Sequence, residues 1–124
     1  MRKATIKRFT APDYSGTEAI NTICTNLSFS GRNCKRIAFT SYMPGAGKTY
    51  ISINVLYNLA KRGKRVLLVD ADLRRSNIVS RLRMETDGEM LGLAHYLAGH
   101  CNLDDCIYET NMYGACIMPA GRDI

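Results

Sequence analysis

The fold of this chain is decided by one stretch, Ser41-Tyr42-Met43-Pro44-Gly45-Ala46-Gly47-Lys48-Thr49. Glycines at these positions let several backbone N–H groups converge on one point, and the positive end of a following helix adds to their attraction for anions. Lys48 supplies a cation that reaches β- and γ-phosphate oxygens, and the Thr49 hydroxyl is a ligand for Mg²⁺. The stretch therefore predicts a nucleotide-binding P-loop, with Tyr42 in the place of the usual first glycine.

The segments on either side of the loop have the order that a P-loop requires. Residues 35–40 are a short β-prone run, typical of a buried strand. After the loop, Ile51, Val55 and Leu59 recur at helical spacing. Lys61-Arg62-Gly63 then supplies cations and a glycine, which favour the end of a helix. A plain turn between strand and helix would explain the glycines, but it has no need for a lysine at the helix start.

A second candidate site follows the next apolar run, residues 66–69. Four consecutive apolar residues predict a buried strand that ends at Asp70, and open α/β sheets hold their ligands at this end of a strand. Asp72 lies two residues further on. Paired carboxylates beside a phosphate site hold Mg²⁺, and one of them can accept the proton of an attacking hydroxyl. A solvated acidic turn is the alternative, but the position after a P-loop favours the metal site.

These patterns predict one α/β domain of the P-loop type, incomplete, with flanking helices on a parallel sheet. We expect a flexible basic arm over residues 1–12 and the partial domain over 13–124. A capping box, Ser15-Gly16-Thr17-Glu18, begins a first helix whose apolar stripe is Ile20, Ile23 and Leu27 and which ends at Gly31. The three predicted strands cover 35–40, 66–69 and 115–118, and short helices are predicted over 91–98 and 103–108.

Charge and cysteine content exclude several classes of protein. The net charge is +6, but the aromatic residues do not alternate with the basic ones, so we expect no nucleic-acid partner. The five cysteines lack paired spacing, which indicates free thiols. There is no run of about eighteen apolar residues and no signal-peptide core. We therefore expect a cytoplasmic domain.

The two motifs together resemble a known family. Ser41 to Thr49, followed by the apolar run ending Asp70-Ala71-Asp72-Leu73-Arg74, is similar to the Walker A and Walker A′ motifs of the bacterial tyrosine kinases. These are autokinases of capsular and exopolysaccharide synthesis. The segments 92–99 and 118–121 are similar to the family's Gly-Leu-x-x-x-Leu-x-Gly and Pro-x-Gly segments. The resemblance covers the chain from about Glu18 to its last residue.

The resemblance implies a protein-tyrosine kinase that uses ATP and Mg²⁺. It implies catalytic roles for Lys48, Asp70 and Asp72, without dividing the roles of base and metal ligand between the two aspartates. It also implies a transmembrane adaptor of the polysaccharide co-polymerase type, which would hold the kinase at the inner face of the membrane. The implied metal ligands are Thr49, Asp70 and Asp72. The implied nucleotide-binding residues are Pro44, Gly45, Ala46, Gly47, Lys48, Thr49, Tyr50 and Arg74.

The sequence departs from the family pattern in two respects. The Walker B strand and the tyrosine-rich tail do not follow the segment 118–121, so we expect a truncated N-terminal part of the kinase domain. In the family, a helix reading Glu-x-x-Arg-x-x-Arg-Thr-Asn packs subunits into a ring. Asn21 and Cys24 stand where its arginines would be, and neither can copy the planar fork of arginine. Homo-oligomer formation through this helix is therefore in question.

Two other functions remain open from the residues. One is a nucleotide-binding regulatory module that engages an adaptor without transferring phosphate. The other is a hydrolysing switch, similar to the partition and septum-site ATPases. Those ATPases carry a signature lysine before the double glycine, whereas this chain has Met43 and Pro44 there. The kinase interpretation is favoured over both.

Overall fold

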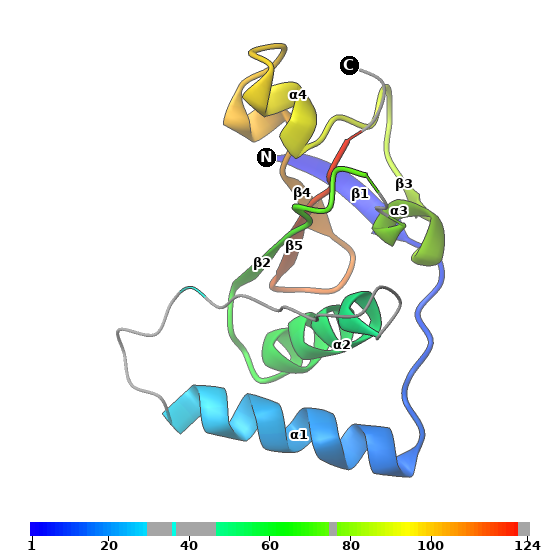
Figure 1. Cartoon of the computed structure of the whole chain (residues 1–124), viewed down its shortest axis with the longest axis vertical. Coiled ribbons are helices and arrows are strands. Elements are labelled where there is room, and N and C mark those ends of the chain that lie inside the picture. Colours follow the sequence, from blue (N-terminus) through cyan, green and yellow to red (C-terminus); the bar gives the residue numbers. More distant parts are fainter. Residues whose placement is uncertain (30–35, 37–46, 75–76, 122–124) are drawn as a thin grey trace.

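The computed structural model describes residues 1–29, 36, 47–74 and 77–121. In these ranges two long helices stack below a five-stranded sheet, and smaller elements surround the sheet (Figure 1). The predicted strand over 35–40 and loop residues 41–46 lie outside the described residues, except for Arg36. The strands are β1 (Arg2–Ile6), β2 (Val66–Val69), β3 (Met84–Glu85), β4 (Tyr108–Thr110) and β5 (Ala115–Met118). The helices are α1 (Tyr14–Phe29), α2 (Lys48–Lys61), α3 (Ile78–Arg81), α4 (Leu93–Leu97) and the 3₁₀ turn η1 (Leu103–Asp105).

The α/β architecture is confirmed, but the expectation of a purely parallel sheet with three strands is wrong. The strand order is β2-β5-β4-β1-β3. β2 pairs with β5 and β1 pairs with β4 in parallel, whereas β4 with β5 and β1 with β3 are antiparallel. The connection between β4 and β5 is a short turn, residues 111–114, in which Gly114 has a φ of 89°. Such a short connection joins only antiparallel strands, so the sheet is mixed.

The N-terminal segment contains a strand where we expected a flexible arm. Ala4 and Ile6 are buried and alternate with exposed residues, as in a half-buried strand. The basic side chain of Arg2 donates hydrogen bonds to the backbone oxygens of Asp87 and Glu89, at 2.6 and 2.7 Å. The Arg2 side chain thus makes hydrogen bonds within the fold. The strand was not predicted because basic residues at a chain end were interpreted as a solvent-exposed arm.

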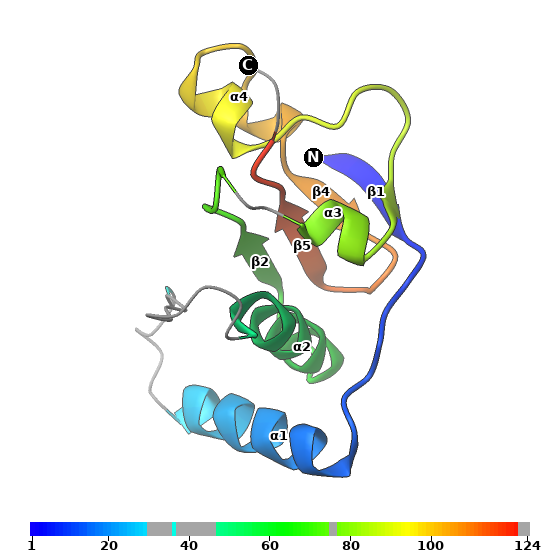
Figure 2. The same ribbon diagram turned by 45° about the vertical axis from the view of Figure 1, so that its right-hand side comes forward.

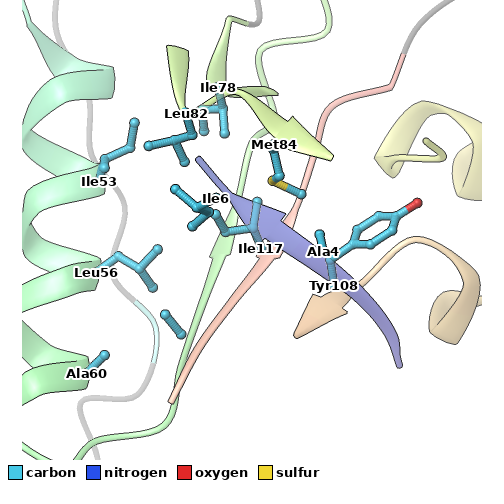
Figure 3. Packing of buried hydrophobic residues seen from close by; sticks show 11 residues of the cluster. Ala4, Ile6, Ile53, Leu56, Ala60, Ile78, Leu82, Met84, Tyr108 and Ile117 are labelled. Atoms are coloured by element: carbon cyan, nitrogen blue, oxygen red, sulfur yellow. The ribbon is translucent and has the colours of Figure 1, made fainter. Parts of the chain in front are cut away.

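Helix α2 lies between α1 and the sheet (Figures 1 and 2). On one side Ile53, Leu56 and Ala60 pack into the main core, where Ile117 of β5 is completely buried (Figure 3). On the other side, Val55 and Leu59 pack against α1. The predicted helical pattern is confirmed, and the helix is apolar on two faces because it is covered on both.

The predicted apolar stripe of α1 is confirmed, but its cap lies elsewhere than expected. Ile20 is buried against α2, and Ile23 and Leu27 are partly buried beside it. The Gly16 amide donates to Asp13 Oδ1 at 2.7 Å, so Asp13 caps the helix and the expected capping box at Ser15 is wrong. The acceptor is thus the carboxylate of an aspartate two residues before the expected serine. The expected end at Gly31 lies outside the described residues.

The C-terminal part of the chain agrees in outline with the predicted elements. The helix expected over 91–98 is α4, and the strand expected over 115–118 is β5. The helix expected over 103–108 is only the 3₁₀ turn η1, because Tyr108 already belongs to β4. No helix among the described residues is long and apolar enough to cross a membrane.

Buried thiols give the fold a predictable response to alkaline pH. Cys24, Cys101, Cys106 and Cys116 form no disulfide among the described residues. Burial is the main cause that raises the pKa of the Cys106 thiol from 9.0 to about 11, and it also raises the pKa of Cys24 and of Cys116. The thiols of Cys24, Cys106 and Cys116 therefore keep their protons to higher pH in the folded chain than in the unfolded chain.

The free energy of unfolding should fall as the pH rises from about 9 towards 11. In that window the unfolded chain releases thiol protons that the folded chain retains, so the contribution present below pH 9 is lost. For Cys106 alone the loss by pH 10 is about 1 kcal/mol. Urea unfolding at pH 8, 9 and 10 in reducing buffer measures it. A Cys106→Ala variant should show a smaller pH slope, and a slope equal to that of the original chain would contradict the account.

Candidate functional site

The start of α2 has the geometry of a phosphate-binding helix end. Gly47 precedes the helix with a φ of 82° and a ψ of 13°, a left-handed conformation that glycine adopts without a Cβ clash. The Gly47 carbonyl accepts a hydrogen bond from the Ile51 amide of the helix, at 2.9 Å. The N–H groups of the first turn point out of the helix end and carry its partial positive charge. The described part of the predicted P-loop therefore presents donors for an anion.

Two further predicted site residues lie in the first turn of α2. Thr49 and Tyr50 are half-buried. Their backbone oxygens accept hydrogen bonds from Ser52 Oγ and Asn54 Nδ2, both at 2.9 Å. These bonds hold the backbone of the turn that carries the Thr49 side chain. The predicted residues Pro44, Gly45 and Ala46 lie outside the described residues.

Asp70 and Asp72 form one ordered turn at the carboxyl end of β2. The Asp70 amide donates to Met118 O of β5 at 2.9 Å, which continues the strand pairing to the last residue before the turn. The Asp72 amide donates to Asp70 Oδ1 at 3.0 Å. This side-chain bond to the second residue on is an Asx turn, so the first carboxylate positions the backbone of the second. Both aspartates are half-buried, and Arg74 is exposed two residues later.

The chain connection directs these two parts towards the same side of the α2–β2 unit. α2 ends at Lys61, Gly63 has a φ of 85°, and the Lys64 amide donates back to Leu59 O at 3.1 Å. The turn is short, so β2 starts beside the end of α2 and runs back along it. The helix is about 20 Å long and the strand about 13 Å. The end of β2 thus points towards the start of α2.

The described residues alone provide no protein cage for a metal ion. No group of three or more His, Cys, Asp or Glu side chains in the described ranges is arranged to hold one. Mg²⁺ usually takes one or two carboxylates, and its remaining ligands are phosphate oxygens and water. The carboxylates of Asp70 and Asp72 and the hydroxyl of Thr49 are the donor types that such a nucleotide-bound metal requires. The residues therefore fit Mg²⁺ that arrives with a polyphosphate.

Hydrogen bonds at the start of α4, which were not predicted from the sequence, hold the adjacent strand end. His95 of α4 is buried, and its Nδ1 accepts the Gly92 N–H at 3.0 Å. Leu93 and Ala94 donate to the backbone oxygens of Pro119 and Ala120, at 2.7 and 2.8 Å. The start of α4 is thereby bonded to the residues that follow β5. Met118 of β5 also accepts the hydrogen bond from the Asp70 amide. The family-like glycine segments at 92–99 and 118–121 were the only sequence signal for it.

The chain is similar in sequence to known proteins. A family model described as an AAA domain matches residues 34–124. Tyrosine-protein kinase CpsD of Streptococcus agalactiae is 39% identical over 105 residues, which are 85% of this chain and 45% of CpsD. The chain thus spans less than half the length of this curated relative.

Solved structures give the same result. The BceF tyrosine kinase domain superposes with a TM-score of 0.76 at 30% identity, over 94% of this chain and 46% of BceF. The septum site-determining protein MinD of Pyrococcus horikoshii, solved with Mg-ADP, has a TM-score of 0.59 at 35% identity. That match covers 64% of this chain and 32% of MinD. The first match extends over more of the chain than the second.

The close approach of Gly121 to His95 predicts that two glycine substitutions differ strongly in their effect on stability. Gly121 and Gly63 have nearly equal φ values, 87° and 85°. A Cβ at Gly121 would lie 2.7 Å from His95 Nδ1, whereas a Cβ at Gly63 meets nothing within 4 Å. Gly63→Ala should cost about 1 kcal/mol from backbone strain, and Gly121→Ala about 2–4 kcal/mol because His95 must also move. Urea unfolding compares them, and equal losses would show that the contact with His95 is not tight.

Proposed function

Since the chain belongs to the bacterial tyrosine kinase family and matches the N-terminal part of its kinase domain, we propose that it serves ATP-dependent phosphorylation of protein tyrosine. The process is the regulation of capsular or exopolysaccharide synthesis. One observation carries the proposal most directly. A left-handed Gly47 opens α2, and the next strand ends in the Asp70–Asp72 turn directed towards that helix end.

In this proposal the loop and helix start bind the nucleotide. Backbone N–H groups from Gly45 to Thr49 would surround the phosphates, and Lys48 would offset the charge on the transferring group. Tyr50 and Arg74 complete the proposed nucleotide-binding set. Thr49, Asp70 and Asp72 would hold Mg²⁺, which supplies charge neutralisation between the β- and γ-phosphates when bound. ATP and ADP are the proposed ligands.

The proposed reaction transfers the γ-phosphoryl group to a tyrosine hydroxyl. The tyrosine oxygen forms a bond to the γ-phosphorus while the bond to the β–γ bridging oxygen breaks, and ADP leaves. A carboxylate of the Asp70–Asp72 turn accepts the hydroxyl proton. Support for this role is the Asx turn itself, in which the Asp70 carboxylate accepts the Asp72 amide and so fixes the backbone that carries the second carboxylate. We do not divide the roles of base and metal ligand between the two aspartates.

The proposed partner is a transmembrane adaptor of the polysaccharide co-polymerase type, which would place the chain at the inner face of the membrane. Assembly of copies through arginine forks on α1 is not part of the proposal. Asn21 Oδ1 accepts a bond from Asn58 Nδ2 at 2.7 Å, and Cys24 is completely buried against α2. The residues at the two positions that carry arginine in the family therefore contact α2 of the same chain.

One alternative has a specific observation in its favour. The match to MinD, a protein solved with Mg-ADP, is what a nucleotide-dependent switch without an acceptor would also give. A regulatory module that binds nucleotide and transfers nothing is the related possibility. An added tyrosine peptide separates them: phosphotyrosine formation supports the kinase, and phosphate release without acceptor supports the switch. Nucleotide binding with neither product supports the regulatory module.

The nucleotide assignment is tested by replacing Lys48. Lys48→Met should abolish calorimetrically measurable binding of Mg·ATP, because the bonds from a charged donor to phosphate contribute about 1.5–3 kcal/mol each. Lys64→Met, at an exposed lysine in the turn after α2, is the matched control and should bind normally. Circular dichroism checks that both variants fold. Normal ATP affinity in Lys48→Met would contradict the assignment.

A further inference from the structure

A cavity of about 440 Å³ lies between the segment 8–10, the first turns of α2, and α3. The two views of the chain agree with this place: the N-terminal segment passes α3 on its way down to α1 (Figures 1 and 2). Its volume is in the range of sites that bind small ligands or a few side chains. Tyr50, in the first turn of α2, forms part of the wall, so the cavity adjoins the helix end that carries the predicted P-loop.

The cavity has a strongly one-sided charge. Arg8 and Arg81 line it, and no lining residue is an aspartate or a glutamate. Neither arginine lies within salt-bridge distance of a carboxylate in the described part of the chain, whereas the neighbouring Lys7 pairs with Glu85 at 2.9 Å. Guanidinium groups bind carboxylates and phosphates through paired hydrogen bonds. The cavity is therefore built to attract an anionic group.

The backbones that carry both arginines are fixed to each other. The amides of Lys7 and Arg8 both donate to Leu82 O, at 3.1 and 3.0 Å, and Leu82 is buried at the end of α3. The Arg81 amide donates to Asn77 O at 2.8 Å within the same turn. The two cationic side chains thus leave one rigid junction, which reduces the entropy lost on binding.

Apolar surface lies beside the two cations. Phe9 is half-buried and lines the cavity, and its ring centroid lies 4.4 Å from that of Tyr57 of α2, with the two rings tilted by 36°. Ile53 also lines the cavity but is only 3% exposed, so Phe9 supplies more of the apolar surface. Side chains with hydroxyl or amide groups, Asn77 and Ser80, complete the polar wall from α3. The arrangement suits a ligand with an apolar or aromatic part and carboxylates next to it.

We propose that this cavity docks an acidic peptide segment that carries the acceptor tyrosine. Carboxylates beside the tyrosine pair with Arg8 and Arg81, and the apolar part of the segment lies against Phe9 and Ile53. The segment is thereby held next to the start of α2, where the phosphates are proposed to bind. The inference rests on the proposed kinase function, because it names the class of peptide that the site accepts.

The test is a direct binding titration of the complete chain without nucleotide. The probe is a fluorescein-labelled peptide with one tyrosine flanked by glutamates, and the matched probe has glutamines in their place. Fluorescence anisotropy should show at least about tenfold tighter binding of the glutamate peptide, with the preference weakened by salt. This comparison uses the unmodified chain, so it does not depend on the folding of a variant.

Variants then locate the binding. Arg8→Ala with Arg81→Ala should remove the preference for glutamate. Lys64→Ala with Arg65→Ala removes two exposed cations outside the cavity wall and is the charge-matched control, which should keep the preference. Equal affinity for both peptides would overturn the proposal. So would displacement of the peptide by adenosine monophosphate, which would make the cavity part of the nucleotide site. Tighter binding of a glutamine-flanked phosphotyrosyl peptide would overturn it in favour of product recognition.

The titration tests the docking site and the kinase assay tests the proposed function, so a negative result in one does not imply a negative result in the other. No phosphate is transferred in the titration, so a chain that binds the glutamate peptide but forms no phosphotyrosine would contradict the proposed function and keep the docking site. A chain that phosphorylates tyrosine with no preference for glutamate would keep the function and overturn the docking site.

Discussion

Burial of α2 on two opposite faces is the constraint on which the rest of the structure depends. Leu56 packs into the core beneath the sheet, and Val55 and Leu59 pack against α1. A helix held from both sides has little freedom to slide or rotate, because interiors pack as closely as organic crystals. Gly47, at its start, is thus placed by the packing of the helix in the core.

The Asp70–Asp72 turn is likewise held in place by the elements beside it. The Asp70 amide is bonded to Met118 of β5, and the residues after β5 accept bonds from the amides of Leu93 and Ala94 at the start of α4. The sheet therefore holds the Asp70 backbone directly, and the Asp70 side chain holds the Asp72 amide. Sites on rigid elements hold reacting groups more accurately than sites on loops. The structure thus holds α2 from two layers and the turn from the sheet.

The sequence allowed the local elements to be predicted better than their pairing. Spacing identified α2 and β5, because burial of a helix face or a strand leaves a direct pattern in the residue order. β2 lies at the predicted residues, but Leu67 and Val69 are each 44% exposed, so the expected burial of this strand is wrong among the described residues. β2 stands at the edge of the sheet, and the main core contacts it only through Val66 and Leu68. The strand at Arg2–Ile6 was missed, since Arg2 satisfies distant carbonyls that no local pattern reveals. The acidic turn was predicted from Asp70 and Asp72, but their hydrogen bond was not. The contacts around His95 and the cavity at Arg8 and Arg81 were not predicted, because each brings together residues that are far apart in the chain.

The central claim is that the start of α2 and the acidic turn act as one nucleotide site. Hydrogen exchange with mass spectrometry, with and without saturating Mg·ATP, tests it most directly, since bound phosphate slows exchange of the amides that it contacts. The account predicts that peptides covering 47–51 and 70–73 gain protection together at one nucleotide concentration. Protection of only one of these segments, or of neither at saturation, would contradict it.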